Sequence, residues 1–399
     1  MRTAFPGILA INAGSSTLRF GLYQAANTPR MLIRGKIDRI GVEGTQWRVC
    51  DASGATLEES SLGGADHAAA STFLLDWLER QPALPAIGAV SHRVVHGMAY
   101  KAPTRVTADL LDELRRITPF DPEHLPFEID LIAEVQRRRP AVTQIACFDT
   151  AFHRDMPQVA KRLAIPRRFQ AAGVERYGFH GLSYAFLMEE LLRLGDPAAS
   201  QGRVILAHLG NGASMAAVRN GRSIDTSMGF TPASGLMMST RSGDLDPGLG
   251  HFLAQSERMD EAQFHHMVNH ASGLLGVSET SSDVRDLLAH ETKDPRAAEA
   301  LALFCYLAKK CIGAYSAALG GLDTLVFAGG IGEGAPAIRA RICAGLEFLG
   351  IEIQSIRNTP SAAIISSPDS RVTVRVISTD EEQMLARSAL PFIELPRTP

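Results

Sequence analysis

The feature that most constrains the fold of this chain is a short pattern that occurs once in each half. The apolar run 8–10 leads into a small, polar loop at 12–17, and the apolar run 205–207 leads into a similar loop at 209–214. A second apolar run follows each loop, so each copy predicts a β-hairpin whose tip exposes backbone amides. The repeat favours a duplicated fold, although two unrelated hairpins would give the same pattern.

Outside the hairpins, short runs rich in Val, Ile and Leu alternate with longer helical periodicities. This alternation predicts an α/β protein whose sheets are covered by helices. One helix is expected at 107–117, where Thr107 is a suitable N-cap and the leucines share one face. Another is expected to begin at Asp294-Pro295 and to end near Gly320.

The length of 399 residues indicates two domains rather than one. No Pro- or Ser-rich linker separates the halves, so we expect a hinge within ordered chain near 150–153. The first domain is then 1–150 and the second is 151–379. The segment of about 380–399 is expected to cross back and complete the first domain.

Composition and charge exclude several classes of protein. With 45% hydrophobic and 21% charged residues, the chain can form a globular core. A net charge of -3 provides no global field that would hold nucleic acid or an anionic membrane. The cysteines form no CxxC pair, no apolar run reaches the roughly 20 residues of a membrane helix, and no secretory leader is evident. We therefore expect an enzyme of the cytoplasm.

Three glycine-rich loops could hold an anion, because glycine lets backbone N–H groups approach phosphate oxygens closely. They are 12–17, 210–214 and 329–334. The last follows an expected strand at 324–327 and precedes a helix from about Pro336, so a helix N-terminus would add to its preference for anions. One such loop alone is usually a simple turn, but three together indicate phosphate binding.

Arginine and acidic side chains lie where predicted strands end. Arg93 and Arg241 are expected on loops, where they could bracket a phosphoryl group or form surface ion pairs. Asp149 follows an expected strand at 144–148 and could bind magnesium or act as a base. Glu381 is a second possible ligand, or a charge that complements a helix N-terminus.

Two histidines have glycine-rich surroundings. His180 lies in RYGFHG and His208 in AHLGNG. Either could donate a hydrogen bond to charge that develops on a transferred group, or could be a core histidine bound to a backbone carbonyl.

Nine motifs follow one another along almost the whole chain. They are NAGSS at 12–16, HRVVHG at 92–97, FDTAFH at 148–153, RYGFHG at 176–181, HLGNG at 208–212, TSMGFTP at 226–232, TR.G..DP at 240–247, SSDVR at 281–285 and GLEFLG at 345–350. In these motifs and their order the chain closely resembles the acetate kinases, which belong to the superfamily of acetate and sugar kinases, Hsc70 and actin.

The resemblance implies an α/β fold of two duplicated actin-like, or ribonuclease H-like, domains that flank an active-site cleft, with the nucleotide site in the second domain. It implies an acetate kinase, which transfers a phosphoryl group reversibly and in line from ATP to acetate and yields acetyl phosphate and ADP. Mg2+ or Mn2+ would be the cofactor and ATP the co-substrate. The partners would be these small molecules and, in a homodimer, a second copy of the chain.

Carried over residue by residue, the resemblance implies a role for each candidate. The catalytic residues would be Arg93, Asp149, His180 and Arg241. The acceptor would be bound by Asn12, Arg93, Val95, Phe179 and Pro232. The metal would be bound by Asn12 and Glu381, with Asp149 helping to organise it. The nucleotide would be bound by Ser15, Thr17, Arg19, His208, Leu209, Gly210, Asn211, Gly212, Asp283, Val284, Arg285, Gly330, Ile331, Gly332, Glu333 and Gly334.

The chain departs from the family pattern at several places. Arg19 stands where the family usually has Lys. The family's Pro-Leu-His-Asn-Pro is replaced by the stretch 119–124, so its His is missing and Asp121 or His124 would take part of its role. Gly334 replaces an Asn expected near the adenine, which leaves the choice of phosphoryl donor open.

Two alternatives remain open. A propionate kinase would differ in a pocket that admits one more methylene, worth only about 1–3 kcal/mol, and Phe120 would favour the smaller acid. A non-catalytic, actin-like nucleotide-binding protein would have no need of Arg93, Asp149, His180 and Arg241 together.

Overall fold

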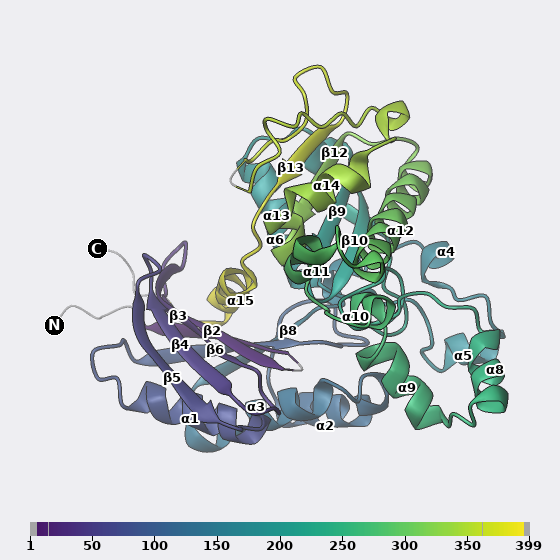
Figure 1. Cartoon of the computed structure of the whole chain (residues 1–399). Coiled ribbons are helices and arrows are strands. Elements are labelled where there is room, and N and C mark those ends of the chain that lie inside the picture. Colours follow the sequence, from purple (N-terminus) through teal and green to yellow (C-terminus); the bar gives the residue numbers. More distant parts are fainter. Residues whose placement is uncertain (1–5, 15, 361, 395–399) are drawn as a thin grey trace. The chain divides into compact units, whose positions relative to one another are not determined.

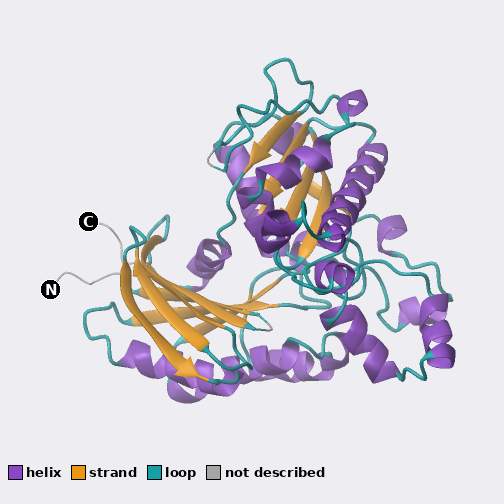
Figure 2. Cartoon of the chain, in the orientation of Figure 1, coloured by secondary structure: helices purple, strands orange, loops and turns teal. Residues whose placement is uncertain are grey.

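The computed structural model describes residues 6–14, 16–360 and 362–394 (Figure 1). It divides into two compact units. The first runs to Ala151 and resumes at Asp380, and the second is Phe152–Thr379. Each unit has its own sheet, with helices packed on it (Figure 2).

The described residues of the first unit form one sheet of eight strands in the order β5-β4-β3-β2-β1-β6-β8-β7. Its strands are β1 Gly7–Ala13, β2 Thr17–Gln24, β3 Arg30–Asp38, β4 Thr45–Asp51, β5 Thr56–Gly63, β6 Ile87–Val94, β7 Thr104–Arg105 and β8 Thr143–Phe148. The first five form an antiparallel meander. β6 and β8 then run parallel to β1, and β7 is antiparallel to β8 at the edge.

Helices cover both faces of this sheet. The helices of the first unit are α1 His67–Glu79, α2 Ala108–Arg116, η1 Thr118–Phe120, α3 Leu125–Arg138, α15 Glu381–Ala389 and η4 Leu390–Phe392. Ile11 of β1 belongs to one apolar cluster with Leu74 of α1 and Leu131 of α3. Because side chains alternate along a strand, Asn12 points to the opposite face, where it contacts Glu381 of α15. The far end of the chain therefore completes the first unit.

The second unit repeats the strand order of the first. Its sheet, in the order β11-β10-β9-β12-β13, consists of β9 Arg203–Leu209, β10 Ala213–Arg219, β11 Arg222–Thr226, β12 Thr324–Ala328 and β13 Thr373–Val376. β9, β10 and β11 are antiparallel neighbours, and β12 and β13 run parallel to β9. The order and directions match those of β3-β2-β1-β6-β8, so the two units share one topology.

Helices also pack on both faces of the second sheet. The helices between β8 and β13 are η2 Ala151–His153, α4 Gln158–Lys161, α5 Arg167–Ala171, α6 Gly181–Arg193, α7 Ala198–Gln201, α8 Gly248–Ser256, α9 Glu261–His270, α10 Gly273–Ser278, α11 Val284–His290, α12 Pro295–Leu319, α13 Gly329–Gly334, α14 Pro336–Cys343 and η3 Glu347–Leu349. Leu206 of β9 packs with Leu187 of α6. Ile205 and Ala207 face the other way and are equally buried, and α12 contacts this strand. Across residues 6–14, 16–360 and 362–394, no helix has both the length and the apolar character that a membrane span requires.

Both predicted hairpins and both predicted helices are confirmed. β1 pairs with β2, and β9 with β10, each through a tight connection. The Thr107 hydroxyl caps α2 by accepting the Leu110 N–H at 3.2 Å. Asp294 caps α12 by accepting the Arg296 N–H at 3.0 Å, and Gly320 ends that helix with a left-handed φ of 71°. These elements follow from local sequence signals.

One predicted loop position is wrong. Arg93, expected after the strand, lies within β6. β8 pairs with β6 at Arg93 and Val94, and this pairing extends the strand beyond the apolar run at 87–90. Backbone pairing therefore fixes Arg93 more firmly than a loop would.

The predicted loop 329–334 is also wrong, because these residues form the short helix α13. The buried Arg339 donates to the carbonyls of Gly332 and Glu333 at 2.8 and 2.7 Å. These carbonyls lie at the end of the helix, where intrahelical partners are missing, so Arg339 stabilises the turn. The strand before it and the helix α14 after it are confirmed.

Candidate active site

Three candidates in the first unit come from neighbouring parallel strands. Asn12 lies near the end of β1, Arg93 near the end of β6, and Asp149 directly after β8. Because β1, β6 and β8 are parallel neighbours, their carboxyl ends lie at one edge of the sheet. This is the edge at which α/β proteins usually bind ligands. The topology thus gathers residues that are far apart in sequence.

Arg93 and Asp149 form a buried ion pair. The guanidinium Nε and Nη2 donate to Asp149 Oδ2 at 2.9 and 2.6 Å, and Nη1 donates to the Ala13 carbonyl at 2.9 Å. The two side chains are 13% and 1% exposed, so this is not a surface ion pair. Burial raises the pKa of Asp149, Arg93 acts to lower it, and the charge of Glu381 raises it further.

Asn12 links this edge of the sheet to α15. Its Nδ2 donates to Glu381 Oε2 at 2.7 Å and to Glu382 Oε1 at 3.3 Å. Glu381 is the first residue of α15, so its position fits both a metal ligand and a charge that complements the helix dipole.

The Oδ1 atom of Asp149 is a possible ligand for a cation at this site. It is buried and has no hydrogen-bond partner among the residues that the structure describes. A buried carboxylate oxygen near a second carboxylate, Glu381, suits a divalent cation. Within the described ranges, no three His, Cys, Asp or Glu side chains converge to form a metal site by themselves. A cation here would therefore take much of its coordination from water and substrate, as Mg2+ commonly does.

Glu128 also belongs to this cluster, and the sequence interpretation missed it. Its Oε2 accepts the N–H of Val95 at 3.0 Å, and its Oε1 lies 3.6 Å from Arg93 Nη1. The side chain is 1% exposed. The available signal was periodicity, because Glu128 occupies the apolar face of α3 together with Ile132 and Val135.

Asp121 and His124, the two candidates for the role of the family's histidine, pair with each other. His124 donates its backbone N–H to Asp121 Oδ1 at 3.2 Å, and its ring Nδ1 lies 2.8 Å from the same oxygen. Burial acts to raise the pKa of Asp121, but the hydrogen bond and charge of His124 lower it overall. The nearby ring of His96 is buried, which lowers its pKa to about 4. Asp121 and His124 thus form one buried unit.

The other first-unit candidates are more dispersed. Val95 is buried directly after β6. Thr17 donates its hydroxyl to Asp38 Oδ1 at 3.0 Å. Arg19 is exposed on β2, opposite Asn12 in the ladder. Ser15 lies outside the described residues.

In the second unit, His180 is held in an unusual conformation. It precedes α6 with φ 58° and ψ 26°, a left-handed geometry that is costly for a residue other than glycine. Its Nδ1 lies 2.8 Å from Ser214 Oγ, and its ring stacks on His208 with centroids 4.4 Å apart. Strain of this kind is concentrated at functional sites.

Arg241 lies close to these histidines. A Cβ added to Gly212 would lie 3.2 Å from His180 Nε2 and 3.8 Å from Arg241 Nη1, so the imidazole and the guanidinium both lie beside Gly212. Arg241 Nη1 also donates weakly to the Pro232 carbonyl at 3.4 Å. The structure therefore brings together His180, His208, Gly212, Pro232 and Arg241.

Gly273, at the start of α10, fixes the backbone of Arg241. Its φ is 64°, and an added Cβ would lie 2.2 Å from the Met238 carbonyl oxygen and 2.8 Å from that of Arg241. Only glycine fits here. No motif in the sequence interpretation included this position.

The nucleotide candidates of the second unit lie in two groups. Leu209, Gly210, Asn211 and Gly212 form the β9–β10 tip, where Asn211 Oδ1 accepts the Ser239 hydroxyl at 3.2 Å. β12 pairs with β9 up to Ala328 and His208, so α13 with Gly330, Ile331, Gly332, Glu333 and Gly334 begins beside this tip. The second group, Asp283, Val284 and Arg285, begins α11, where Asp283 caps the helix and pairs with the exposed Arg285.

Phe179, a proposed pocket wall, is almost fully buried. Its carbonyl accepts a hydrogen bond from the ring of His153 at 3.2 Å. Burial lowers the pKa of His153 to about 4. His153 is therefore a core histidine bound to a backbone carbonyl, the role given above as the alternative for His180 and His208.

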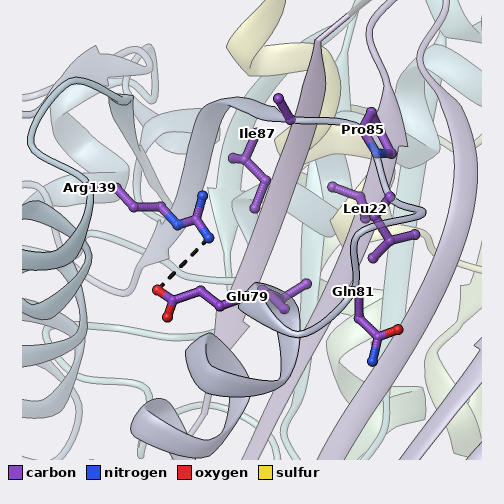
Figure 3. Close-up of a pocket in the computed structure, with 9 residues that line it drawn as sticks. Leu22, Glu79, Gln81, Pro85, Ile87 and Arg139 are labelled. Atoms are coloured by element: carbon purple, nitrogen blue, oxygen red, sulfur yellow. Dashed lines mark ion pairs between the residues drawn. The ribbon is translucent and has the colours of Figure 1, made fainter.

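A separate cavity of about 190 Å3 occurs in the first unit (Figure 3). It is lined by Leu22, Leu78, Glu79, Gln81, Leu84, Pro85, Ala86, Ile87 and Arg139, and the carboxylate of Glu79 lies 3.9 Å from the guanidinium of Arg139. Ile87 begins β6, whereas Arg93 lies near its end. The cavity is therefore at the opposite edge of the sheet from the candidate site.

Comparisons with known proteins agree on one family. The model of the acetokinase family matches residues 7–387. An acetate kinase of Rhodopseudomonas palustris (strain TIE-1) is 42% identical over 387 residues, which cover 95% of this chain and 96% of the relative. A propionate kinase of Citrobacter rodentium is 41% identical over 405 residues, or 98% of each chain.

Solved structures give the same picture. The crystal structure of Porphyromonas gingivalis acetate kinase matches with a TM-score of 0.87 at 34% identity, covering 98% of this chain and 100% of that one. A propionate kinase from Francisella tularensis matches with a TM-score of 0.89 at 34% identity, covering 96% and 99%.

Proposed function

Because the chain belongs to the acetokinase family, we propose that it transfers a phosphoryl group between ATP and acetate, with propionate as the alternative acceptor. The chain is thus a phosphotransferase whose acceptor is a carboxyl group. The duplicated actin-like fold implied by the resemblance is confirmed by the repeated strand order and by the solved relatives. The observation that carries the proposal is the buried Arg93–Asp149 pair at the carboxyl edge of the first sheet.

In the first unit, Arg93 would bind the carboxylate of the acceptor and stabilise the transferring phosphoryl group. Its planar fork of donors matches both groups, and the strand pairing of β6 holds it in place. Asn12 and the buried Val95 would contribute to the acceptor site. Because a carboxylate is already a nucleophile at neutral pH, Asp149 would orient Arg93 rather than act as a strong base.

In the second unit, His180 and Arg241 would donate to the phosphoryl oxygens as charge spreads over them. Both side chains lie beside Gly212, which supports this role. The β9–β10 tip and α13 would hold the nucleotide, since both present backbone N–H groups at the ends of parallel strands. Phe179 and Pro232 would line the acceptor pocket.

Magnesium fits the acidic residues of the first unit. Asn12 and Glu381 would hold it, with Asp149 helping through the Oδ1 that has no hydrogen-bond partner within the described residues. When bound, the ion would neutralise charge on the phosphate oxygens. A domain division at about 150 and 380, a homodimer and a cytoplasmic location are further proposals, which rest on the sequence and the family resemblance.

The test is trapping of acyl phosphate with hydroxylamine, using purified protein, ATP and Mg2+ with acetate, propionate or butyrate, and then pyrophosphate in place of ATP. We expect hydroxamate with ATP and the two shorter acids. No hydroxamate from any acid with either donor would refute the proposal.

A matched pair of variants tests the role of Arg241. Arg241→Ala should lower kcat by about 10²–10³-fold while ATP affinity stays within a few-fold. Arg203→Ala is the control, because it removes a half-exposed ion pair with Asp323 in the same unit. Equal activity of the two variants would contradict the role of Arg241.

A further inference from the structure

One arginine in the first unit is shared by more than one buried carboxyl group. Arg93 bonds to Asp149 at 2.6 Å and lies 3.6 Å from Glu128, and each of these carboxyls is 1% exposed. Glu381 also acts electrostatically on Arg93. More acidic side chains than one therefore surround the single guanidinium of Arg93, the group proposed to bind the acceptor.

The two carboxyls contact Arg93 in different ways. Asp149 Oδ2 accepts from both Nε and Nη2, and the Ala13 carbonyl accepts from Nη1. Glu128 Oε1 approaches Nη1 without a hydrogen bond, and this buried oxygen has no hydrogen-bond partner among the described residues. Asp149 thus binds and orients the guanidinium, whereas Glu128 only places charge beside it.

We propose that Glu128 is a positioning residue that, in its ionised form, competes with the carboxylate of the acceptor for Arg93 and thereby makes the affinity for the acceptor depend on pH. The proposal rests on the proposed function. Glu128 is held beside Arg93 by the 3.0 Å hydrogen bond from the Val95 N–H and by its position on the buried face of α3. An ionised Glu128 neutralises Arg93 and repels an incoming carboxylate; a protonated Glu128 does neither.

The groups that face Glu128 determine when it is ionised. They are Arg93 on β6, Asp149 after β8, and Asp121 after η1, the last paired with His124. Burial raises the pKa of Glu128 to about 8; Arg93 and the Val95 N–H oppose this, and Asp121 and Asp149 add to it. Glu128 is therefore mostly protonated at neutral pH. Binding of the acceptor becomes coupled to uptake of one proton above about pH 8.

The test compares the wild type with Glu128→Gln, which keeps an acceptor for Val95 but carries no charge. The KM for acetate and the KM for ATP are measured from about pH 6.5 to 9.5. In the wild type, the acetate KM should rise toward tenfold per pH unit above about pH 8. In Glu128→Gln it should stay flat and be about tenfold lower than the wild type near pH 9, with the ATP KM unchanged.

Asp196→Asn is the matched control. Asp196 is likewise a buried acid paired with an arginine, 2.7 Å from Arg375, but it lies in the second unit away from the candidate residues. It should follow the wild-type pH profile. A Glu128→Gln profile that also follows the wild type, or an equal change in the ATP KM, would refute the inference.

Two further readouts keep the test decisive. If Glu128→Gln does not fold, as judged by circular dichroism, the wild-type profile decides, and an acetate KM that is flat above pH 8 refutes the inference. If the wild type makes no acyl phosphate from any acid, the proposed function fails instead.

Discussion

Replacing Arg93 by Met should destabilise the first unit by about 3–5 kcal/mol near pH 8, the cost of breaking a buried ion pair by removing one partner. The guanidinium makes two hydrogen bonds to Asp149 and one to the Ala13 carbonyl, and it lies 3.6 Å from Glu128. Met fills a similar volume but leaves two buried carboxyl groups without a compensating charge.

The loss of stability should depend on pH in one direction. In the wild type, burial raises the pKa of Asp149 and raises that of Glu128 to about 8, while Arg93 acts to lower both. Without Arg93 both pKa values should rise further. A carboxyl whose folded-state pKa exceeds its unfolded value stabilises the fold fully only below the unfolded value, and this contribution is lost as pH rises through the folded value. The deficit of the variant should therefore be smaller near pH 5 than near pH 8.

Tryptophan fluorescence during urea denaturation reports this unit selectively. Both tryptophans of the chain, Trp47 and Trp77, lie in its core and are 0% and 7% exposed. Arg116→Met is the control, because its ion pair with Glu113 is on the surface and its loss should change little. A deficit below about 1 kcal/mol at pH 8, or one that is equal at pH 5, would refute the assignment of Arg93 as the counter-charge of this cluster.

Three further predictions concern the proposed chemistry. Gly273→Ala should lower kcat/KM at least about tenfold by displacing the Arg241 backbone, since its Cβ would lie 2.2 Å from the Met238 carbonyl oxygen; unchanged kinetics would contradict this. Arg339→Met should raise the KM for ATP about tenfold and leave the KM for acetate unchanged, because Arg339 stabilises α13; equal changes in both constants would count against it. Asp149→Asn should raise the Mg2+ concentration needed for half-maximal activity about tenfold, measured by titration of chelated enzyme, and an unaltered requirement would remove Asp149 from the metal site.

Local patterns were sufficient to predict the elements whose causes are local. The two hairpins follow from apolar runs that flank small polar loops, and α2 and α12 follow from the caps Thr107, Asp294 and Gly320. The order of the motifs predicted the family, and through it the duplicated fold. The functional roles of the individual residues stay predictions.

Errors arose where distant partners decide the structure. Arg93 lies in a strand because β8 pairs with it, and no property of 87–97 alone reveals that partner. The helix α13 depends on Arg339, which follows it in the chain and binds its last carbonyls.

Glu128 was missed for a related reason. A single acid among apolar helix positions is conspicuous only once the helix face is known to be buried. Its relation to Arg93 depends on how α3 packs on β6, and that packing is a tertiary property.

The placement of α15 has a consequence for biosynthesis. One face of the first sheet is covered by a helix that is translated only after the whole of Phe152–Thr379, roughly 230 residues later. At about 5–20 residues per second, the ribosome needs on the order of 10–50 s to make that segment. During this interval the first unit has its hairpins, α1 and α3. The candidate site at the carboxyl ends of β1, β6 and β8 still lacks Glu381, and one apolar face of the sheet is uncovered. The nascent chain should therefore be a chaperone client until α15 emerges.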